Sequence, residues 1–177
     1  SKYISLFGGE VDADEYSSLD AAITAVGSTI RTIRDSSDQT LTTTTNIPKT
    51  LTIHRTGSAK ITIAAALEVT WNGPIVADEG QLFVYANNLT SKIKLAQGAL
   101  QSTWYLGWWG MTAGSAAADV SLANWTAHQH ALDTLSNVNG YNSAATLIAP
   151  SGDFYFSNRL YYEGTNVGGL TLTGAVG

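Results

Sequence analysis

The sequence predicts a mainly β fold, and three observations support this class. Short β-prone runs with near alternation of apolar and polar residues recur from Thr29 to Leu95. A turn signal separates each run from the next, and no long helical pattern lies between them. These features argue strongly against a doubly wound α/β fold. They leave a sandwich, a barrel and a parallel β-helix open.

A short helix is expected before the strands, over residues 17–27. Apolar residues recur at helical spacing from Leu19 to Val26. Ser17 is the expected N-cap, and Asp20 lies in the first turn, where a carboxylate is favourable. Gly27 is a suitable stop because glycine accepts the left-handed backbone that ends many helices. The apolar face of this helix requires a surface to cover.

The strands expected next are separated by turn signals such as residues 46–48, 56–58 and 72–74, which are rich in Asn, Gly and Pro. Threonine and β-branched apolar residues, both favourable in strands, dominate the runs between them. The expected strands cover residues 29–33, 40–42, 51–53, 60–63, 67–71, 81–85 and 92–95.

The second half of the chain repeats this order of a helix followed by strands. A helix over residues 124–135 is expected, with Asn124 as its cap and Trp125, His128 and Leu132 on one face. The repeat distance of about 110 residues indicates a weak internal duplication. The expected later strands cover residues 145–149, 153–156, 159–162 and 169–173. The expected divisions are an N-terminal segment (1–16), a first helix with its coils (17–103), a Trp-rich junction (104–123) and a second helix with further strands (124–177).

Three stretches together carry a resemblance to a known family. Residues 48–77 alternate short strand and turn, residues 104–114 read WYLGWWGMTAG, and residues 124–172 combine a capping helix, strands and a Pro-Ser-Gly-Asp turn. In this order they resemble the opening segment of right-handed parallel β-helix proteins of the pectate lyase superfamily, which includes bacteriophage tailspikes and polysaccharide depolymerases. The resemblance implies right-handed parallel β-helix coils with short capping helices, in two weakly duplicated modules.

The junction departs from the family pattern, which continues into an acidic Gly-Asp-Gly…Asp-Asp segment. Here residues 111–124 read MTAGSAAADVSLAN, with Gly114 retained and Asp119 as the single acid. No ion-binding or substrate role is therefore carried over. Family catalytic acids lie on later coils, expected beyond Gly177, so no catalytic residue is assigned and enzymatic activity stays open.

The function implied by the resemblance is the N-terminal structural or attachment part of a phage tailspike-like or tail fibre-like protein directed at bacterial surface glycans. The alternative is a fragment of a secreted polysaccharide lyase or glycoside hydrolase. A third possibility is a purely structural adhesion module. The expected partners are further copies of the chain in a trimer, bacterial surface polysaccharide and other virion tail proteins. The expected location is the virion tail, with secretion as the alternative.

Composition argues against other classes of partner. The chain has 9 basic and 14 acidic residues, a net charge of −5, and charged residues make up 13% of it. A nucleic-acid-binding surface needs a basic patch, so nucleic acid is not expected. No apolar run approaches the roughly 20 residues of a membrane-spanning helix, so membrane insertion is not expected either. Nor does the N-terminus resemble a signal peptide. Cysteine is absent, which excludes disulfides and thiolate metal sites, and no cofactor or metal site is expected.

The aromatic residues are the candidate glycan-binding site, because exposed aromatic rings can stack on sugar faces. The competing interpretation for the junction is a hydrophobic plug, in which the rings fill the gap between two sets of coils. The plug is favoured, since Gly107 and Gly110 indicate tight chain reversal beside the rings. The candidate glycan-binding residues are Trp104, Trp108, Trp109, Tyr155 and Tyr161.

Other polar residues are expected to have ordinary structural roles. The histidines lack carboxylate partners at metal-binding spacing, and the turn aspartates are expected to bond to their own backbone, although paired carboxylates can hydrolyse glycosides. The acidic cluster near the N-terminus lacks a known calcium-loop spacing and is expected to be solvated. These residues are His54, His128 and His130; Asp35, Asp38 and Asp153; and Glu10, Asp12, Asp14 and Glu15.

Overall fold

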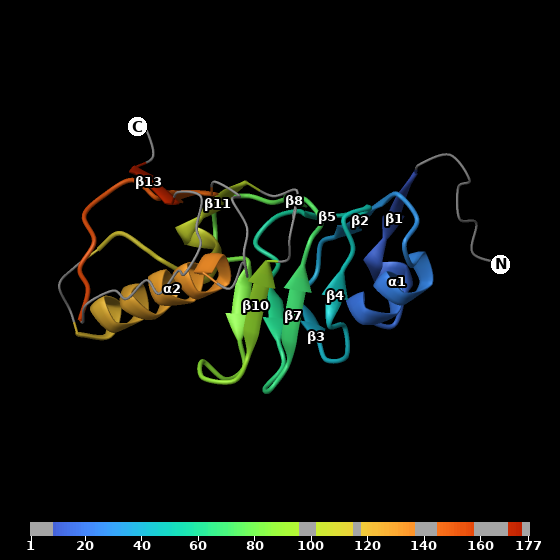
Figure 1. Cartoon of the computed structure of the whole chain (residues 1–177), viewed down its shortest axis with the longest axis horizontal. Coiled ribbons are helices and arrows are strands. Elements are labelled where there is room, and N and C mark those ends of the chain that lie inside the picture. The colour runs from blue at the N-terminus through green and yellow to red at the C-terminus, as the bar shows by residue number, and fades with distance from the viewer. Residues whose placement is uncertain (1–8, 96–101, 115–117, 137–144, 158–169, 175–177) are drawn as a thin grey trace.

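The computed structural model describes residues 9–95, 102–114, 118–136, 145–157 and 170–174. A stack of short strands occupies the middle of the molecule, with α1 at one end and α2 at the other (Figure 1). Two helices and two 3-10 turns, η1 and η2, accompany the strands. The elements are β1 Glu10–Asp12, η1 Ala13–Glu15, α1 Leu19–Val26, β2 Arg31–Asp35, β3 Gln39–Leu41, β4 Asn46–Ile47, β5 Leu51–Arg55, β6 Ile61–Ile63, β7 Glu68–Trp71, β8 Ile75–Val76, β9 Phe83–Tyr85, β10 Lys92–Leu95, β11 Thr103–Tyr105, η2 Leu106–Trp109, α2 Ala118–Ser136, β12 Ala145–Ala149 and β13 Leu170–Gly174.

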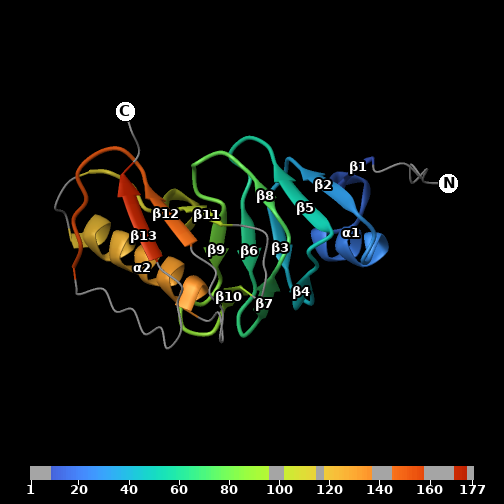
Figure 2. The same ribbon diagram turned by 45° about the horizontal axis from the view of Figure 1, so that its top comes forward.

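The strands form small sheets in which every described pair is parallel. The orders are β1-β2-β5-β8, β3-β6-β9, β4-β7-β10 and β11-β12-β13. The chain visits the first three sheets in the same order three times, as β2-β3-β4, β5-β6-β7 and β8-β9-β10 (Figure 2). The mainly β prediction is therefore confirmed, and the short strands are joined across successive passes of the chain instead of as antiparallel hairpins.

Branched apolar side chains stack in register inside the three-sheet stack. Val11, Ile33, Ile53 and Ile75 occupy partner positions on β1, β2, β5 and β8. The three isoleucines are at most 6% exposed. Burying each such side chain contributes about 1.5–3 kcal/mol, so these columns are the main source of stability. The threonines next to these residues along the strands point to the opposite face of the sheet, because side chains alternate along a strand.

Helix α1 covers the β2 and β3 end of the stack. Its N-cap is Ser18, whose Oγ accepts from the Ala21 backbone N–H at 3.1 Å, so the expectation of Ser17 is wrong by one residue. Ser18 has the extended backbone that a cap requires, which places its hydroxyl beside the first free N–H groups. Gly27 ends the helix at φ 60°, as expected.

Asp20 holds α1 to the turn after β3. Its carboxylate accepts from Thr42 N and Thr42 Oγ1 at 2.7 and 2.8 Å and from Thr44 N at 2.9 Å, and the residue is 7% exposed. Burial alone would raise the pKa of Asp20, but the hydrogen bonds from Thr44 and Thr42 outweigh it and lower the pKa. The ionised carboxylate is therefore the form that the fold prefers.

Replacing Asp20 with alanine is expected to lower the free energy of unfolding by about 1–3 kcal/mol at neutral pH, because four donors of the turn, including Thr43 N, lose their acceptor. A folded-state pKa below the unfolded value means that this stabilisation is present above about pH 4 and is lost as pH falls through the folded pKa. Urea unfolding at neutral and acid pH measures both effects. Asp153→Ala is the control, since Asp153 is exposed. Equal losses of unfolding free energy in the two variants would contradict the role of Asp20 in holding α1 to the turn.

Several expected elements differ from the structure. Residues 46–48 were expected as a turn, but β4 pairs with β7 there, and β8 pairs with β5. Both strands have only two residues, too few to show the alternation of apolar and polar residues that predicts a strand. The strand expected at 153–156 is wrong, since this segment is irregular, and the strand expected at 159–162 lies outside the described residues. Phe154 is partly buried against the core without joining a sheet.

Helix α2 begins at Ala118, six residues before the expected start. Asn124 is not a cap but a fully buried residue within the helix. Its amide accepts from Thr112 N and donates to Thr112 O, both at 3.0 Å. A tertiary partner, absent from the local sequence pattern, thus satisfies the side chain that suggested a cap. The helix crosses the expected boundary at residues 123 and 124, and the other proposed divisions stay predictions.

The second helix also precedes a strand, as α1 precedes β2. Strand β12 pairs with β11 on one side and β13 on the other. The C-terminal end of α2 lies beside β10 in both views (Figures 1 and 2). In the described part of the chain, neither helix has the length and apolar character needed to cross a membrane.

Candidate functional site

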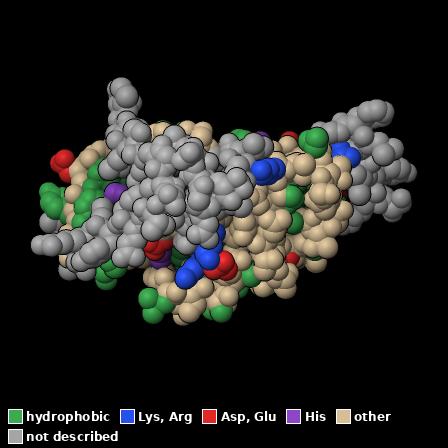
Figure 3. All heavy atoms as spheres, viewed as in Figure 1, with side chains coloured by type: hydrophobic (Ala, Val, Ile, Leu, Met, Phe, Trp, Pro, Cys, Tyr) green, Lys and Arg blue, Asp and Glu red, His purple; other side chains and the backbone are tan. Residues whose placement is uncertain are grey.

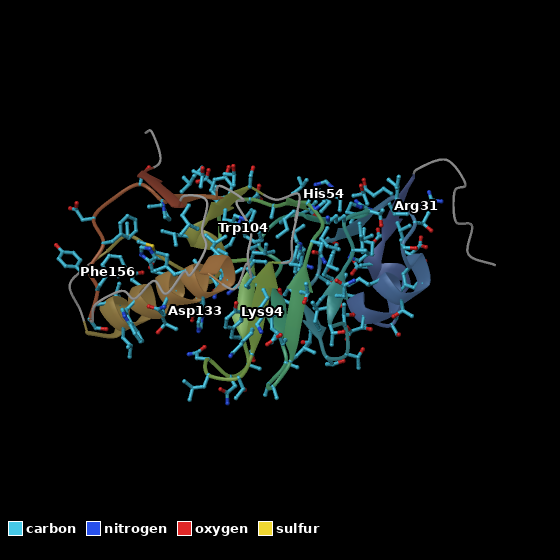
Figure 4. All side chains as sticks on the ribbon, in the orientation of Figure 1. Arg31, His54, Lys94, Trp104, Asp133 and Phe156 are labelled. Carbon is cyan, nitrogen blue, oxygen red and sulfur yellow. The ribbon has the colours of Figure 1, made fainter. Side chains whose placement is uncertain are left out.

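The three tryptophans of the junction form one buried cluster. Trp104, Trp108 and Trp109 are 0%, 1% and 6% exposed. The ring centroid of Trp104 lies 5.8 Å from those of both Trp108 and Trp109. Phe83 joins the cluster at 5.4 Å from Trp109 and connects it to Trp71 at 5.5 Å, within the range of favourable aromatic pairs. Figure 4 shows Trp104 between α2 and the stack.

The backbone beside the rings is also closely packed. A Cβ added to Gly107 would lie 2.0 Å from Glu79 O, and Gly110 has φ 90°, so glycine is required at both positions. The Trp108 indole N–H donates to Asp78 O at 2.8 Å, and Leu82 N donates to Trp108 O. The cluster thus packs as the hydrophobic plug interpretation predicts. Trp104 and Trp108 present no open ring face on which a sugar could stack.

Beside the plug lies an open groove of about 550 Å³ between β9, η2 and α2. Its size falls within the range of small-molecule sites. Of the predicted site residues that the structure describes, Trp109 alone lines it. The lining residues are Gln81, Phe83, Val84, Tyr85, Asn88, Trp109, Gly110, Leu122, Ala123, Thr126, Ala127 and His130.

Tyr85 and His130 form the polar centre of this groove. Their ring centroids are 4.3 Å apart. The Tyr85 hydroxyl accepts from the Trp109 indole N–H at 3.3 Å, and His130 Nε2 lies 3.3 Å from Asn88 O. Thr126 donates its hydroxyl to Leu122 O, which leaves lone pairs on Oγ1 to accept from a ligand. The groove therefore combines aromatic surface with several hydrogen-bonding groups.

Among the described residues that line the groove, none is Asp, Glu, Lys or Arg. Burial raises the pKa of Tyr85, and burial lowers the pKa of His130 although Asn88 O and Asp133 act in the opposite direction. Both side chains are therefore neutral near pH 7. An uncharged, partly aromatic groove suits a neutral ligand that has both C–H faces and hydroxyl groups. Figure 3 shows basic and acidic side chains close together on this side of the molecule. On the neighbouring strands β7 and β10, Glu68 and Lys94 form an ion pair with an N–O distance of 2.7 Å.

The other predicted glycan-binding residues lie elsewhere. Tyr155 is 44% exposed but does not line the groove, and Tyr161 lies outside the described residues. Phe156, the residue after Tyr155, is 38% exposed and lies near the N-terminal half of α2 in Figure 4. The structure thus separates the tyrosine that is exposed from the tryptophans that are buried.

The acidic residues near the N-terminus are exposed or half-buried, as expected, and several of them also have partners. Arg34 contacts Glu10 at 3.0 Å and Asp12 at 2.6 Å, and Ser36 and Ser37 donate their hydroxyls to Asp14. These hydrogen bonds lower the pKa of Asp14. Among the described residues, no group of three or more His, Cys, Asp or Glu side chains is placed to hold a metal ion.

Asp35 was expected in a turn but closes β2 as a fully buried carboxylate. It forms an ion pair with Arg55, which is 2% exposed, and also accepts from Ser37 N at 3.3 Å. The bond from Ser37 N is the local backbone bond that was expected of Asp35, whereas Asp38 accepts over a long range from Lys60 N at 2.8 Å. His54 lies half-buried on β5.

No protein-family model, curated protein or solved structure matches this chain.

Sequence reasoning missed most of the groove. Tyr85 was expected only as the end of a strand, Asn88 only as part of a turn, and His130 only as a boundary histidine. His130 and Asn88 are 42 residues apart in the chain. No local pattern marks residues that meet across such a distance, so the groove could be found only after folding.

Proposed function

We propose that this chain is the N-terminal structural and attachment part of a phage tailspike-like or tail fibre-like protein directed at bacterial surface glycans, and that its coils form a right-handed parallel β-helix. The observation that carries the proposal is the fixed order in which the chain visits three parallel sheets. Such a stack pairs its backbone along its whole length and exposes unpaired strand edges only at its ends. A protein of this shape is suited to a rigid stalk.

Two further features support a stalk. Helix α1 lies at one end of the stack, and the Trp plug with α2 lies at the other, so both sets of terminal strands have a neighbour. The low proportion of charged residues and the lack of cysteine favour stability by packing and by assembly with further copies. We propose a homotrimer in the virion tail, in contact with other tail proteins.

The uncharged groove between β9 and α2 is the proposed glycan contact. Neutral sugars present C–H faces to aromatic rings and hydroxyls to amides and imidazoles, and the groove offers both kinds of surface. The interaction is expected to be weak in one copy and to gain strength when several copies bind one polysaccharide.

Binding is tested with a panel of purified bacterial capsular and O-antigen polysaccharides and tryptophan fluorescence. At least one neutral polysaccharide is expected to give a saturable change. Leu122→Glu should weaken that binding at least about tenfold, because it places a charge in a neutral groove. Leu122 is 53% exposed, so folding should persist. Ile30→Glu is the matched control, since Ile30 is 76% exposed and lies outside the groove.

Loss of binding in both variants, or in neither, would count against the groove. Light scattering tests the assembly, and a stable monomer at high concentration would oppose the trimer. Release of reducing ends or unsaturated uronates from a polysaccharide would instead favour the lyase or hydrolase alternative.

A further inference from the structure

Helix α2 packs against β10 and η2, and one of its buried residues is a histidine. His128 is 5% exposed and lies one helical turn after the buried Asn124 and one turn before the buried Leu132. Helix docking normally buries apolar side chains, and a titratable group at this position makes docking depend on its charge. The apolar residues beside it are Ala127, Ala131, Leu132 and Leu135.

Among the residues that the structure describes, none is shown to stabilise a positive charge on His128. Its Nδ1 is buried without a hydrogen-bond partner, and its ring faces Phe156 with 5.6 Å between centroids. Burial lowers the pKa of His128, and no charged group offsets this. The described charged groups on neighbouring elements are Lys92, Lys94 and exposed Asp153, and Lys94 is paired with Glu68. Neither these groups nor Asp133 on α2 itself offsets the effect of burial on the pKa of His128.

His130, two residues further on, provides a natural comparison. It stacks on Tyr85, its Nε2 lies 3.3 Å from Asn88 O, and Asp133 favours its charged form. A proton on His130 therefore has an acceptor and a nearby anion. Burial lowers the pKa of both histidines on α2, but His128 is the one for which no described partner acts in the opposite direction.

We propose that His128 acts as a pH sensor for the docking of α2: its neutral imidazole permits docking, and the imidazolium formed in acid releases the helix and uncovers η2. The lower pKa in the docked state means that docked α2 binds fewer protons than released α2. Docking is therefore strongest above the ordinary histidine pKa of about 6.5 and weakens as pH falls below it. The proposal does not depend on glycan binding.

Hydrogen exchange with mass spectrometry tests the proposal on the full chain. Protection factors for residues 118–136, corrected for the intrinsic effect of pH, are compared between about pH 7.5 and pH 5. Protection of α2 is expected to fall by up to about tenfold per pH unit below pH 6.5, while β2 and β5 keep theirs. Unchanged protection of α2, or an equal loss in β5, overturns the proposal.

Two variants separate His128 from other causes of acid sensitivity. His128→Gln stays neutral at every pH, so its protection profile for α2 should be much flatter than that of the wild type over this range. His130→Gln should keep most of the wild-type slope, because Asn88 O lies 3.3 Å from His130 Nε2 and can accept from the imidazolium. If glutamine weakens docking at all pH values, a flat profile at the lower level still supports the proposal. A wild-type slope in His128→Gln, or its loss in His130→Gln, overturns it.

Discussion

Replacing Arg55 with alanine is expected to lower the free energy of unfolding by about 3–5 kcal/mol. Arg55 and Asp35 are partners on β5 and β2, and their side chains are 1% and 0% exposed. Burial raises the pKa of Asp35 and lowers the pKa of Arg55, while each charge acts to restore the other. Removing the guanidinium leaves a buried carboxylate and an unpaired Ser37 carbonyl, which had accepted from Arg55 Nη2 at 3.0 Å.

Two controls test whether burial is the cause. The double variant Asp35→Val with Arg55→Met removes both charges and should lie within about 1 kcal/mol of the wild type, because well-packed apolar residues replace a buried pair at little cost. Arg34→Ala breaks exposed ion pairs with Glu10 and Asp12 and should lose at most about 1 kcal/mol. Urea unfolding measures all three. A loss below about 1 kcal/mol for Arg55→Ala would show that the pair is solvated.

Truncating Trp108 to alanine is expected to lower the free energy of unfolding by about 3–5 kcal/mol. The ring is 1% exposed and contacts Phe83, Trp104 and Tyr105 at centroid distances of 6.4, 5.8 and 5.2 Å. Its removal leaves a cavity where β9, β11 and η2 meet, and it frees Asp78 O from its indole donor. In this variant the near-ultraviolet circular dichroism signal of the tryptophan cluster should also decrease.

Tyr155→Ala is the matched aromatic control, because the Tyr155 side chain is 44% exposed. Its change in unfolding free energy should lie within about 0.5 kcal/mol. Stability close to wild type in Trp108→Ala, together with lost polysaccharide binding, would reverse the assignment. The ring would then be a ligand platform instead of a plug.

The comparison of sequence and structure shows where local patterns are sufficient. The alternation in residues 51–53 and 60–63 identified β5 and β6, because a buried strand face must be apolar at every second position. The same rule at helical spacing found α1, although the cap was Ser18 and not Ser17. The two-residue strands β4 and β8 were missed, since their pairing with β7 and β5 supplies the order that their own length does not.

Polar residues were harder to interpret than apolar ones. Asp35 follows a strand in a segment rich in Ser and Asp, which is typical of a turn, yet Arg55 on the next pass of the chain draws it into the interior. Asn124 resembles a cap because its residue type often bonds the nearby backbone, but its amide instead bonds the backbone of Thr112. A side chain that can bond locally or over a long range takes the partner that the fold brings to it, and only the fold specifies that partner.

The sequence by itself determined the mainly β class, the positions of most strands in the stack, α1 and the packing role of the tryptophans, because all of these follow from periodicity and residue type over a few positions. The tertiary structure alone decided the order of strands in the sheets, the buried Asp35–Arg55 pair, the start of α2 and the groove around Tyr85 and His130. These features depend on which distant segments lie side by side, and the free energy that selects those neighbours comes from packing the whole chain at once.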